Sequence, residues 1–154
     1  MQNHNDEQYM RMALEQANEA AAHGDVPVGA VVVRGDEVIA CAHNRREVDR
    51  CATAHAELLA IEDACRALGT WRLSDCTLYV TLEPCPMCAG TIVNARVGRV
   101  VFGAKDAKAG AMGSVLNVNS YPLNHKPRIE SGVLADEGAD VLRVFFEGKR
   151  KKGN

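Results

Sequence analysis

The chain has 154 residues, of which 47% are hydrophobic and 25% are charged, and its formal net charge is −2. This composition fits a soluble globular protein, and no apolar run approaches the ~20 residues needed to span a bilayer, which argues against a membrane protein. At this length we expect one domain, residues 1–154, with a core large enough to need no disulfides.

The first 41 residues predict one helix and one hairpin. Residues 6–23 read as an amphipathic helix ended by Gly24, because apolar side chains recur every three or four residues at Met10, Ala13, Leu14, Ala17 and Ala21. Residues 28–33 are rich in β-branched side chains, a turn follows at 34–36, and residues 38–41 resume a strand.

Helices and strands then alternate. After a polar loop at 44–53, residues 54–68 predict a helix ended by Gly69, with a buried stripe at Leu58, Ile61, Ala64, Cys65 and Leu68. We further expect a strand at 77–81, a helix at 87–95, a strand at 97–102, a long loop rich in glycine and alanine, and a final helix at 135–149. This order predicts a three-layer α/β domain with a mixed sheet.

The N-terminal segment Met1–Asp6 is polar and lacks the apolar stretch of a secretory signal, so we expect a cytoplasmic protein. The cysteines lie at Cys41, Cys51, Cys65, Cys76, Cys85 and Cys88. In a reducing compartment a Cys-x-x-Cys pair indicates a metal or redox site more often than a disulfide.

Cys85 and Cys88 are ambiguous when taken alone. Pro84 and Pro86 bracket the start of the expected helix, so both sulfurs lie in its first turn, where the helix dipole favours thiolates. That environment suits a zinc ligand pair, a redox pair or two ordinary core cysteines. The pair therefore needs a second motif before it indicates chemistry.

The segment His55-x-Glu57 is the second motif, and it is weak by itself, because a His and a Glu at a helix start usually mean capping. Together, His55, Cys85 and Cys88 make three protein ligands, which is the catalytic zinc pattern because a fourth position stays open for water. Glu57 then has a use as the unligated carboxylate that moves protons. His-x-Glu followed by Pro-Cys-x-x-Cys is the signature of zinc-dependent nucleobase deaminases.

The catalytic core does not choose among deaminases of cytidine, guanine, riboflavin intermediates or tRNA, but the flanking residues do. The chain resembles the bacterial tRNA-specific adenosine deaminases, the TadA family, over most of its length. Its most discriminating piece is the Phe-Gly-Ala-x-Asp-x-Lys-x-Gly stretch at 102–110. The resemblance is carried by Val26–Val31, Asn44, Thr53–Glu57, Leu78–Gly90, Arg99–Gly110, Asn124–His125, Gly132–Glu137 and Phe145–Phe146.

The resemblance implies a cytidine-deaminase-like fold with a mixed sheet of about five strands and helices on both faces. It also implies hydrolytic conversion of adenosine to inosine at the wobble position of an arginine tRNA, one Zn²⁺ per chain, and a homodimer. The substrate would be the tRNA anticodon stem-loop, whose unpaired bases need no melting.

The resemblance also implies substrate contacts. Asn44 would hydrogen-bond the flipped base, Val28 and Leu82 would line its pocket, and Asp106 and Lys108 would lie near the sugar-phosphate. Phe145, Phe146 and the basic tail Lys149–Lys152 would belong to the RNA-binding face.

Each of these assignments has a plainer alternative. Asn44 and Asp106 are also typical of loop caps and turns, Val28 and Leu82 of core, and Phe145 and Phe146 of a packed helix face. The tail carries four positive charges, leaving a net of −6 on the rest of the chain, and such a tail is also typical of a solubilising helix end.

Two departures and two other functions stay open at this level. Cys51-Ala52 stands where some relatives have Asp-Pro, close to His55, and Gly138 lies in a helix that would prefer a better helix former. A deaminase of a free base such as guanine would share the catalytic core, and a non-enzymatic zinc or redox module would share the cysteines.

Overall fold

The computed structural model describes residues 4–152, so the outermost residues of the expected domain, 1–3 and 153–154, lie outside the described part. One sheet of five strands organises the chain, in the order β2-β1-β3-β4-β5. The elements in chain order are α1 (His4–Ala22), β1 (Gly29–Arg34), β2 (Glu37–His43), α2 (Arg46–Asp49), α3 (Ala56–Leu68), β3 (Cys76–Leu82), α4 (Pro86–Asn94), β4 (Arg99–Ala104), the 3₁₀ turn η1 (Val118–Ser120), β5 (Arg128–Ser131) and α5 (Ala135–Lys152).

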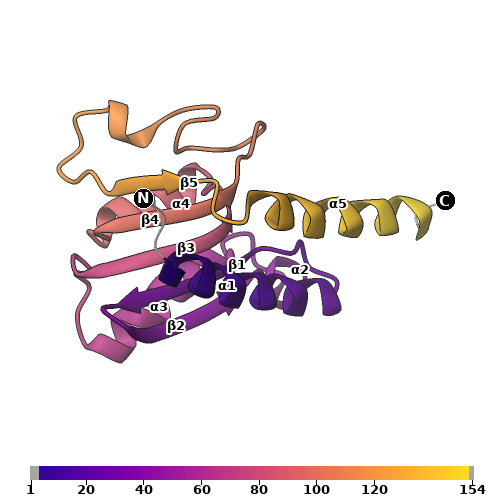
Figure 1. Ribbon diagram of the computed structural model, residues 1–154, viewed down its shortest axis with the longest axis horizontal. Helices are drawn as coiled ribbons and strands as arrows, with labels where there is room; N and C mark the ends of the chain where they lie inside the picture. Colours follow the sequence, from indigo (N-terminus) through magenta and orange to yellow (C-terminus); the bar gives the residue numbers. More distant parts are fainter. Residues whose placement is uncertain (1–3, 153–154) are drawn as a thin grey trace.

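The sheet is mixed, as the sequence predicts. β1 is antiparallel to both β2 and β3, whereas β3, β4 and β5 run parallel. Helices α1 and α5 lie on one face of the sheet, and α3 and α4 lie on the other (Figure 1). The parallel strands β3 and β4 therefore deliver their carboxyl ends, Leu82 and Ala104, to the same edge of the sheet.

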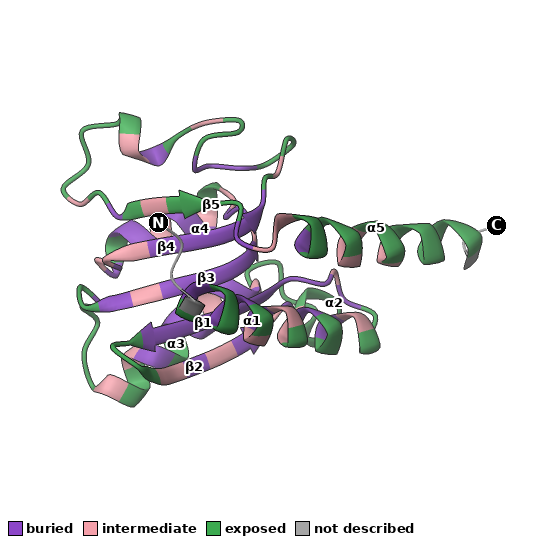
Figure 2. Cartoon of the chain, viewed as in Figure 1, coloured by how far each residue is buried: buried purple, intermediate pink, exposed green. Residues whose placement is uncertain are grey.

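Alternation along the central strands builds two cores. Val32, Leu78, Val80, Val100 and Phe102 face α3 and α4, whereas their strand neighbours Val31, Tyr79 and Val101 pack with Met10 and Ala13 of α1. Strands buried on both faces read as continuous apolar runs, and β1, β3 and β4 are almost wholly buried (Figure 2).

The predicted helices and the first four predicted strands are confirmed to within a few residues. The expected stripe of α3 is wrong in detail, because Ala56, Glu57, Ala60, Ile61 and Ala64 are buried and Leu58 is only half-buried. Small side chains let α3 lie close to β1 and β2, so alanine rather than leucine faces the sheet.

Three elements fall where the sequence predicts only loops. The short helix α2 starts without a side-chain cap of its own, η1 is a single turn, and β5 has only one side chain that is even half-buried, Ile129. Without a periodic apolar pattern, each depends on partners distant in the sequence. β5, for example, is held by parallel pairing with β4.

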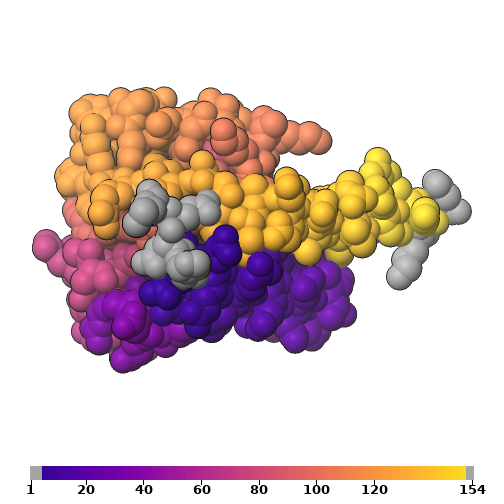
Figure 3. Space-filling view, in the orientation of Figure 1, coloured from indigo at the N-terminus to yellow at the C-terminus, as the bar shows by residue number. Residues whose placement is uncertain are grey.

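The last helix, α5, packs against β4. Its later turns project beyond the rest of the molecule (Figure 3). It continues through Lys149, Arg150 and Lys151, so the basic segment is helical in the described residues. None of the helices in residues 4–152 has the length and apolar character needed to cross a membrane.

Candidate metal and catalytic site

The three predicted ligands meet where α3 and α4 begin, beside the carboxyl end of β3. His55 is the residue immediately before α3, and Cys85 holds the same position before α4. Pro86 occupies the first turn of α4, where its fixed φ suits the helix and its missing N–H costs no hydrogen bond. The starts of two helices thus bring one ring nitrogen and two sulfurs together.

The spacing of the donor atoms fits a tetrahedral metal. The Nδ1 atom of His55 lies 3.7 Å from the Cys85 Sγ and 3.5 Å from the Cys88 Sγ. The three donor atoms all lie within 4.8 Å of one another. A tetrahedral zinc with ordinary Zn–N and Zn–S bonds would place N and S about 3.6 Å apart. The donor set and its spacing therefore fit Zn²⁺ without rearrangement.

The electrostatics of the sulfur pair favour a thiolate. Contact with the Cys88 thiol, helped by the hydrogen bond with His55, lowers the pKa of Cys85 to about 3, against the opposing effect of burial. The same contact with Cys85, followed by burial, raises the pKa of Cys88. One sulfur of the pair thus carries negative charge at neutral pH, which is the form that binds a metal.

Glu57 is buried beside these ligands without being one of them. It sits in the first turn of α3, two residues after His55, with only 4% of its surface exposed, yet it lines the cavity. Burial raises the pKa of its carboxyl to about 7. A carboxyl with a pKa near neutrality is able both to accept and to give a proton.

A cavity of about 560 Å³ opens in front of the ligands. Its wall includes His55, Cys85 and Glu57, together with most of the residues predicted to contact substrate, namely Val28, Asn44, Leu82, Asp106, Lys108 and Phe146. Val28 is buried at the start of β1 and Leu82 is half-buried at the end of β3, so both have a core side and a cavity side.

Asn44 caps a helix and also lines the cavity. Its Oδ1 accepts a hydrogen bond from the Ala56 N–H at 2.8 Å, which caps the start of α3. Within residues 4–152 its Nδ2 amide has no hydrogen-bond partner, and the residue lines the cavity. The cap thus fixes the side chain and leaves the amide donors for a ligand.

Asp106 forms the turn proposed as its plainer alternative, and it also lines the cavity. Its Oδ1 accepts from the N–H groups of Lys108 and Ala109 at 3.0 and 3.1 Å. This local turn presents the Lys108 side chain, which is exposed, at the cavity wall.

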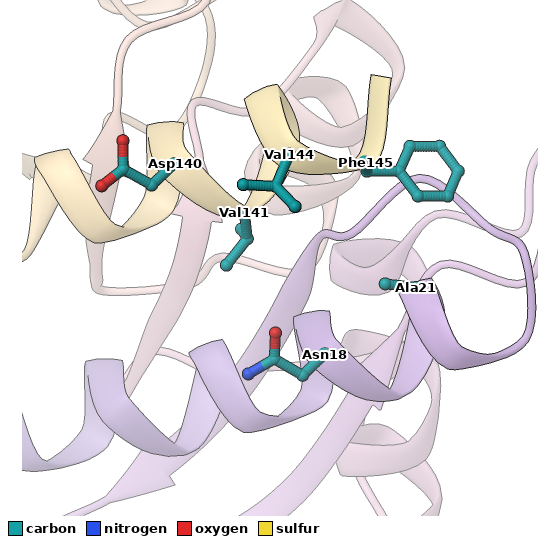
Figure 4. Close-up of a pocket in the computed structure, with 6 residues that line it drawn as sticks. All are labelled: Asn18, Ala21, Asp140, Val141, Val144 and Phe145. Atoms are coloured by element: carbon teal, nitrogen blue, oxygen red, sulfur yellow. The ribbon is translucent and has the colours of Figure 1, made fainter. Parts of the chain in front are cut away.

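The two phenylalanines of α5 line different cavities. Phe146 is 44% exposed and borders the catalytic cavity, whereas Phe145 is half-buried and lines a different cavity of about 250 Å³ between α1 and α5 (Figure 4). Lys149 lies with its Nζ 5.1 Å from the centre of the Phe145 ring. Neither ring is fully buried, so the plainer alternative of a packed helix face fits the half-buried Phe145 only in part and does not fit Phe146.

Several residues that position the site were not predicted. Glu83 accepts hydrogen bonds from Asp106, Met112 and Ser114. Asp25 is buried, and its carboxylate accepts from the N–H groups of Glu47 and Val48, which holds α2 next to the cavity. The only signal for Glu83 in the sequence is its place beside the PCxxC motif. Asp25 has no such signal, because its contacts join residues more than 20 positions apart.

Two further cationic side chains, Arg46 and Lys105, also line the cavity. Cys51, by contrast, is exposed on its loop, with its sulfur 3.3 Å from the Thr53 hydroxyl. With Lys108, three cationic side chains therefore line the cavity.

Comparisons with known proteins show similarity to deaminases. The family model described as MafB19-like deaminase matches residues 4–150. A protein of Bacillus subtilis named tRNA-specific adenosine deaminase is 52% identical over 96% of this chain and 92% of its own length. A structure from work on A-to-I editing by tRNA:A34 deaminases at the wobble position superposes with a TM-score of 0.85, at 44% identity, covering 88% of this chain and 99% of that one.

A guanine deaminase of Bacillus subtilis is also similar, but over less of the chain. It is 38% identical with a TM-score of 0.64, and it covers 73% of this chain and 71% of its own. The fold is thus common to both kinds of deaminase, and the tRNA:A34 deaminase structure is similar at higher identity and TM-score than the guanine deaminase.

Proposed function

Since the chain belongs to the family of tRNA-specific adenosine deaminases, we propose that it hydrolyses adenosine to inosine at the wobble position of a tRNA anticodon. The observation that carries this proposal is the unligated, buried Glu57 beside a three-ligand group, inside a chain that matches these relatives almost end to end. Because the family consists of enzymes, a non-enzymatic zinc or redox module no longer accounts for the chain.

One Zn²⁺ per chain would be held by His55 Nδ1 and the sulfurs of Cys85 and Cys88. Zinc with three protein ligands supplies an activated water, whose pKa falls to about 7. The chain holds the donors for this ion on two helix N-termini whose dipoles favour thiolate charge. The spacing of the three donors supports this assignment.

Glu57 would carry the proton transfers of the reaction. Its carboxylate accepts a proton from the attacking water and returns protons to the substrate ring nitrogen and to the departing amine, so that water is consumed and ammonia is released. Burial against Cys88 and the first turn of α3 fixes its orientation. No other carboxylate of the cavity wall replaces it, because Glu83 and Asp106 bind backbone N–H groups.

The flipped adenine would lie between Val28 and Leu82, with the Asn44 amide donating to the base. The phosphates would be attracted by Lys108, Lys105 and Arg46. The RNA-binding face would also include Asp106, Phe146 and the start of the basic tail, and Phe145 would pack beside it. The lining of the cavity by most of these side chains supports the arrangement. Apolar walls with a few directed polar groups are typical of nucleobase pockets.

We also propose an arginine tRNA as the substrate, a homodimer as the assembly, the cytoplasm as the location and residues 1–154 as one deaminase domain. The extent of the family match, residues 4–150, supports the last of these. Size-exclusion chromatography with light scattering tests the dimer.

The substrate is tested with purified zinc-loaded protein and an unmodified arginine tRNA transcript. Sequencing of the product should report guanosine in place of adenosine at the wobble position only, because inosine pairs like guanosine. A wobble adenosine that stays unchanged under saturating enzyme would contradict the proposed function. Ammonia release from free guanine, with no change in the tRNA, would favour the guanine deaminase alternative.

The roles of the site residues are tested by separating metal content from turnover. Glu57→Gln should lower kcat by at least about 10³-fold while zinc stays near that of the wild type, because the carboxylate is not a ligand. His55→Ala and Cys88→Ala should lose both zinc and activity. Glu62→Gln, on the exposed face of the same helix, and Cys51→Ala, on the exposed loop, are matched controls that should keep both.

A further inference from the structure

One wall of the catalytic cavity is a loop with little packing behind it. Residues 105–109 line the catalytic cavity, and Lys105 and Ala107 also line a second cavity, of about 490 Å³, on the other side of the loop. Most of residues 105–109 are exposed. A segment with open space on both sides needs an anchor other than apolar contact if it is to keep one conformation.

Glu83 supplies that anchor from the end of β3. Its Oε1 accepts from the Asp106 N–H at 3.1 Å and from the Ser114 hydroxyl, and its Oε2 accepts from the N–H groups of Met112 and Ser114 at 2.9 and 3.1 Å. The side chain is only 2% exposed. One buried carboxylate therefore holds both ends of the loop, at residue 106 and at residues 112–114.

Gly110 leaves the space that the carboxylate occupies. A Cβ atom at this position would lie 2.4 Å from the Glu83 Cδ and Oε2 atoms and 2.6 Å from the Asp106 carbonyl oxygen. Real Cβ atoms essentially never approach so closely, so any other residue at position 110 displaces the carboxylate or the loop. The Glu83 carboxylate can therefore occupy its position only because residue 110 is a glycine.

Backbone hydrogen bonds of Glu83 and Pro84 also join the loop to the segment that carries Cys85. The Glu83 N–H donates to the Ala104 carbonyl at 2.9 Å, and the Pro84 carbonyl accepts from the Ala111 N–H at 2.9 Å. Cys85 is the next residue along the chain. The loop with Lys105 and Lys108 is therefore hydrogen-bonded to Glu83 and Pro84, the two residues that precede the predicted metal ligand Cys85.

We propose that Glu83 is a positioning residue for the deamination: its carboxylate fixes the 105–114 loop as a rigid wall, so that Lys105, Asp106 and Lys108 face the RNA at a set distance from the metal ligands. This inference rests on the proposed function for its kinetic consequence. It assigns Glu83 to substrate binding through the loop, with no contact to the reacting atoms.

Glu83→Gln tests the anchor, because an amide nitrogen in place of one oxygen turns a donor toward the loop N–H groups. We expect KM for an anticodon stem-loop to rise about tenfold or more, with kcat changed less than about threefold and zinc content unchanged. Hydrogen exchange should accelerate at the amides of residues 106, 112 and 114, while the amides of β3 keep their protection. Glu37→Gln, an exposed glutamate at the start of β2, is the control.

Gly110→Ala tests the same anchor from the opposite side. It should raise KM and accelerate exchange in the same loop, and its effect should be smaller in a Glu83→Ala background, because the methyl group then meets fewer atoms. Gly90→Ala adds a methyl group that meets no atom within 4 Å, so it should match the wild type. Ser114→Ala removes only the hydroxyl donor and gives a milder variant in case Glu83→Gln does not fold.

The outcomes are distinguishable. Unchanged KM and unchanged exchange of the loop amides in folded Glu83→Gln would overturn the proposal, and so would loss of zinc, which would place Glu83 in the metal site. A wild-type protein that leaves the stem-loop unmodified would overturn the proposed function instead. In that case the exchange measurement still decides whether Glu83 fixes the loop.

Discussion

The Asn44 side chain caps a helix, and we propose that the same side chain binds the substrate base. Its oxygen caps α3 through the Ala56 N–H, while its amide nitrogen borders the catalytic cavity. A cap of this kind contributes about 1 kcal/mol to stability. The two functions use different atoms, so substitutions are able to separate them.

Asn44→Asp should keep the cap and lose the donor, and Asn44→Ala should lose both. We expect Asn44→Asp to retain the stability of the wild type within about 0.5 kcal/mol and to lower kcat/KM on the stem-loop about tenfold or more. Asn44→Ala should lower kcat/KM similarly and lose about 1 kcal/mol of stability as well. Urea denaturation and steady-state kinetics measure the two effects. Equal activity in Asn44→Asp and the wild type would remove the side chain from substrate recognition.

The sequence identified the chemical residues more readily than the residues that hold them. His55, Glu57, Cys85 and Cys88 lie in two short motifs whose spacing carries a chemical meaning. Glu83 and Asp25 act through backbone N–H groups 23–31 and 22–23 positions away, and no local pattern encodes such contacts. Their roles appear only once the fold brings the segments together.

At the scale of the elements, α5 depends on a close approach to the sheet at Gly138. A Cβ atom there would lie 2.6 Å from the Thr81 carbonyl oxygen. Helix propensity alone disfavours a glycine at this position, so the helical pattern by itself does not explain it. The contact explains it: the glycine lets the first turn of α5 rest on the end of β3, and this seat directs Leu142 and Phe146 toward the catalytic cavity.

Gly138→Ala should therefore destabilise the protein, although alanine is the better helix former by about 1 kcal/mol. A backbone oxygen cannot move aside as a flexible side chain does, so overpacking of about 1–3 kcal/mol outweighs the gain in propensity. Gly148→Ala in the same helix adds a methyl group that meets no atom within 4 Å, and it should be neutral or stabilising by up to about 1 kcal/mol. Thermal denaturation of both variants gives the comparison; two changes of the same sign and size would contradict the role of Gly138.

A partly buried polar cluster joins four elements away from the catalytic cavity. The Tyr79 hydroxyl of β3 donates to the Asp6 carboxylate of α1 at 2.7 Å, and Arg99 of β4 bridges Asp6 at 2.6 Å and Glu130 of β5 at 2.8 Å. Burial first, and then the hydrogen bond to Asp6, raises the pKa of Tyr79 well above its ordinary value. β5, which has almost no apolar pattern, is tied to the fold partly through this cluster.

The cluster predicts a loss of stability in alkali. The unfolded chain releases the Tyr79 proton near pH 10, whereas the folded chain keeps it to higher pH, so the free energy of unfolding falls as pH rises above about 10. Tyr79→Phe lacks this proton. It should cost about 1 kcal/mol at neutral pH, and the difference from the wild type should shrink between about pH 9 and 11. Urea denaturation across this range measures the difference, with Tyr121→Phe, which removes an exposed phenol, as the control. A difference that stays constant with pH would show that the phenol is not linked to folding.

The whole molecule carries a net charge of −2, yet it is proposed to bind a polyanion. The distribution of charge resolves this. Arg46, Lys105 and Lys108 border the catalytic cavity, and α5, which contributes Phe146 to the same cavity, continues into Lys149, Arg150 and Lys151. Three basic side chains thus border the cavity at the carboxyl ends of β3 and β4, and the helix that borders the same cavity ends in a basic segment.

Neutralising the end of α5 should therefore weaken RNA binding in a salt-dependent way. For single-stranded RNA each phosphate contact contributes about 0.7 to the slope of log affinity against log salt, so Lys149→Gln, Arg150→Gln and Lys151→Gln combined should lower the slope by up to about 2. The kcat at saturating RNA should stay unchanged, because these side chains do not touch the reacting base.

The matched control removes three positive charges from the opposite end of the sheet. Arg34 pairs in register with Cys76 at the start of β3, Arg128 pairs with Arg99 at the start of β4, and Arg72 precedes β3. A strand of this length separates them from the cavity by about 20 Å, which is more than two Debye lengths at physiological salt. Arg34→Gln, Arg72→Gln and Arg128→Gln combined should leave the slope near that of the wild type, although the change in net charge is the same. Fluorescence anisotropy of a labelled stem-loop across a salt series measures both. An equal loss of slope in the two triple variants would mean that net charge, rather than its placement on α5, governs RNA binding.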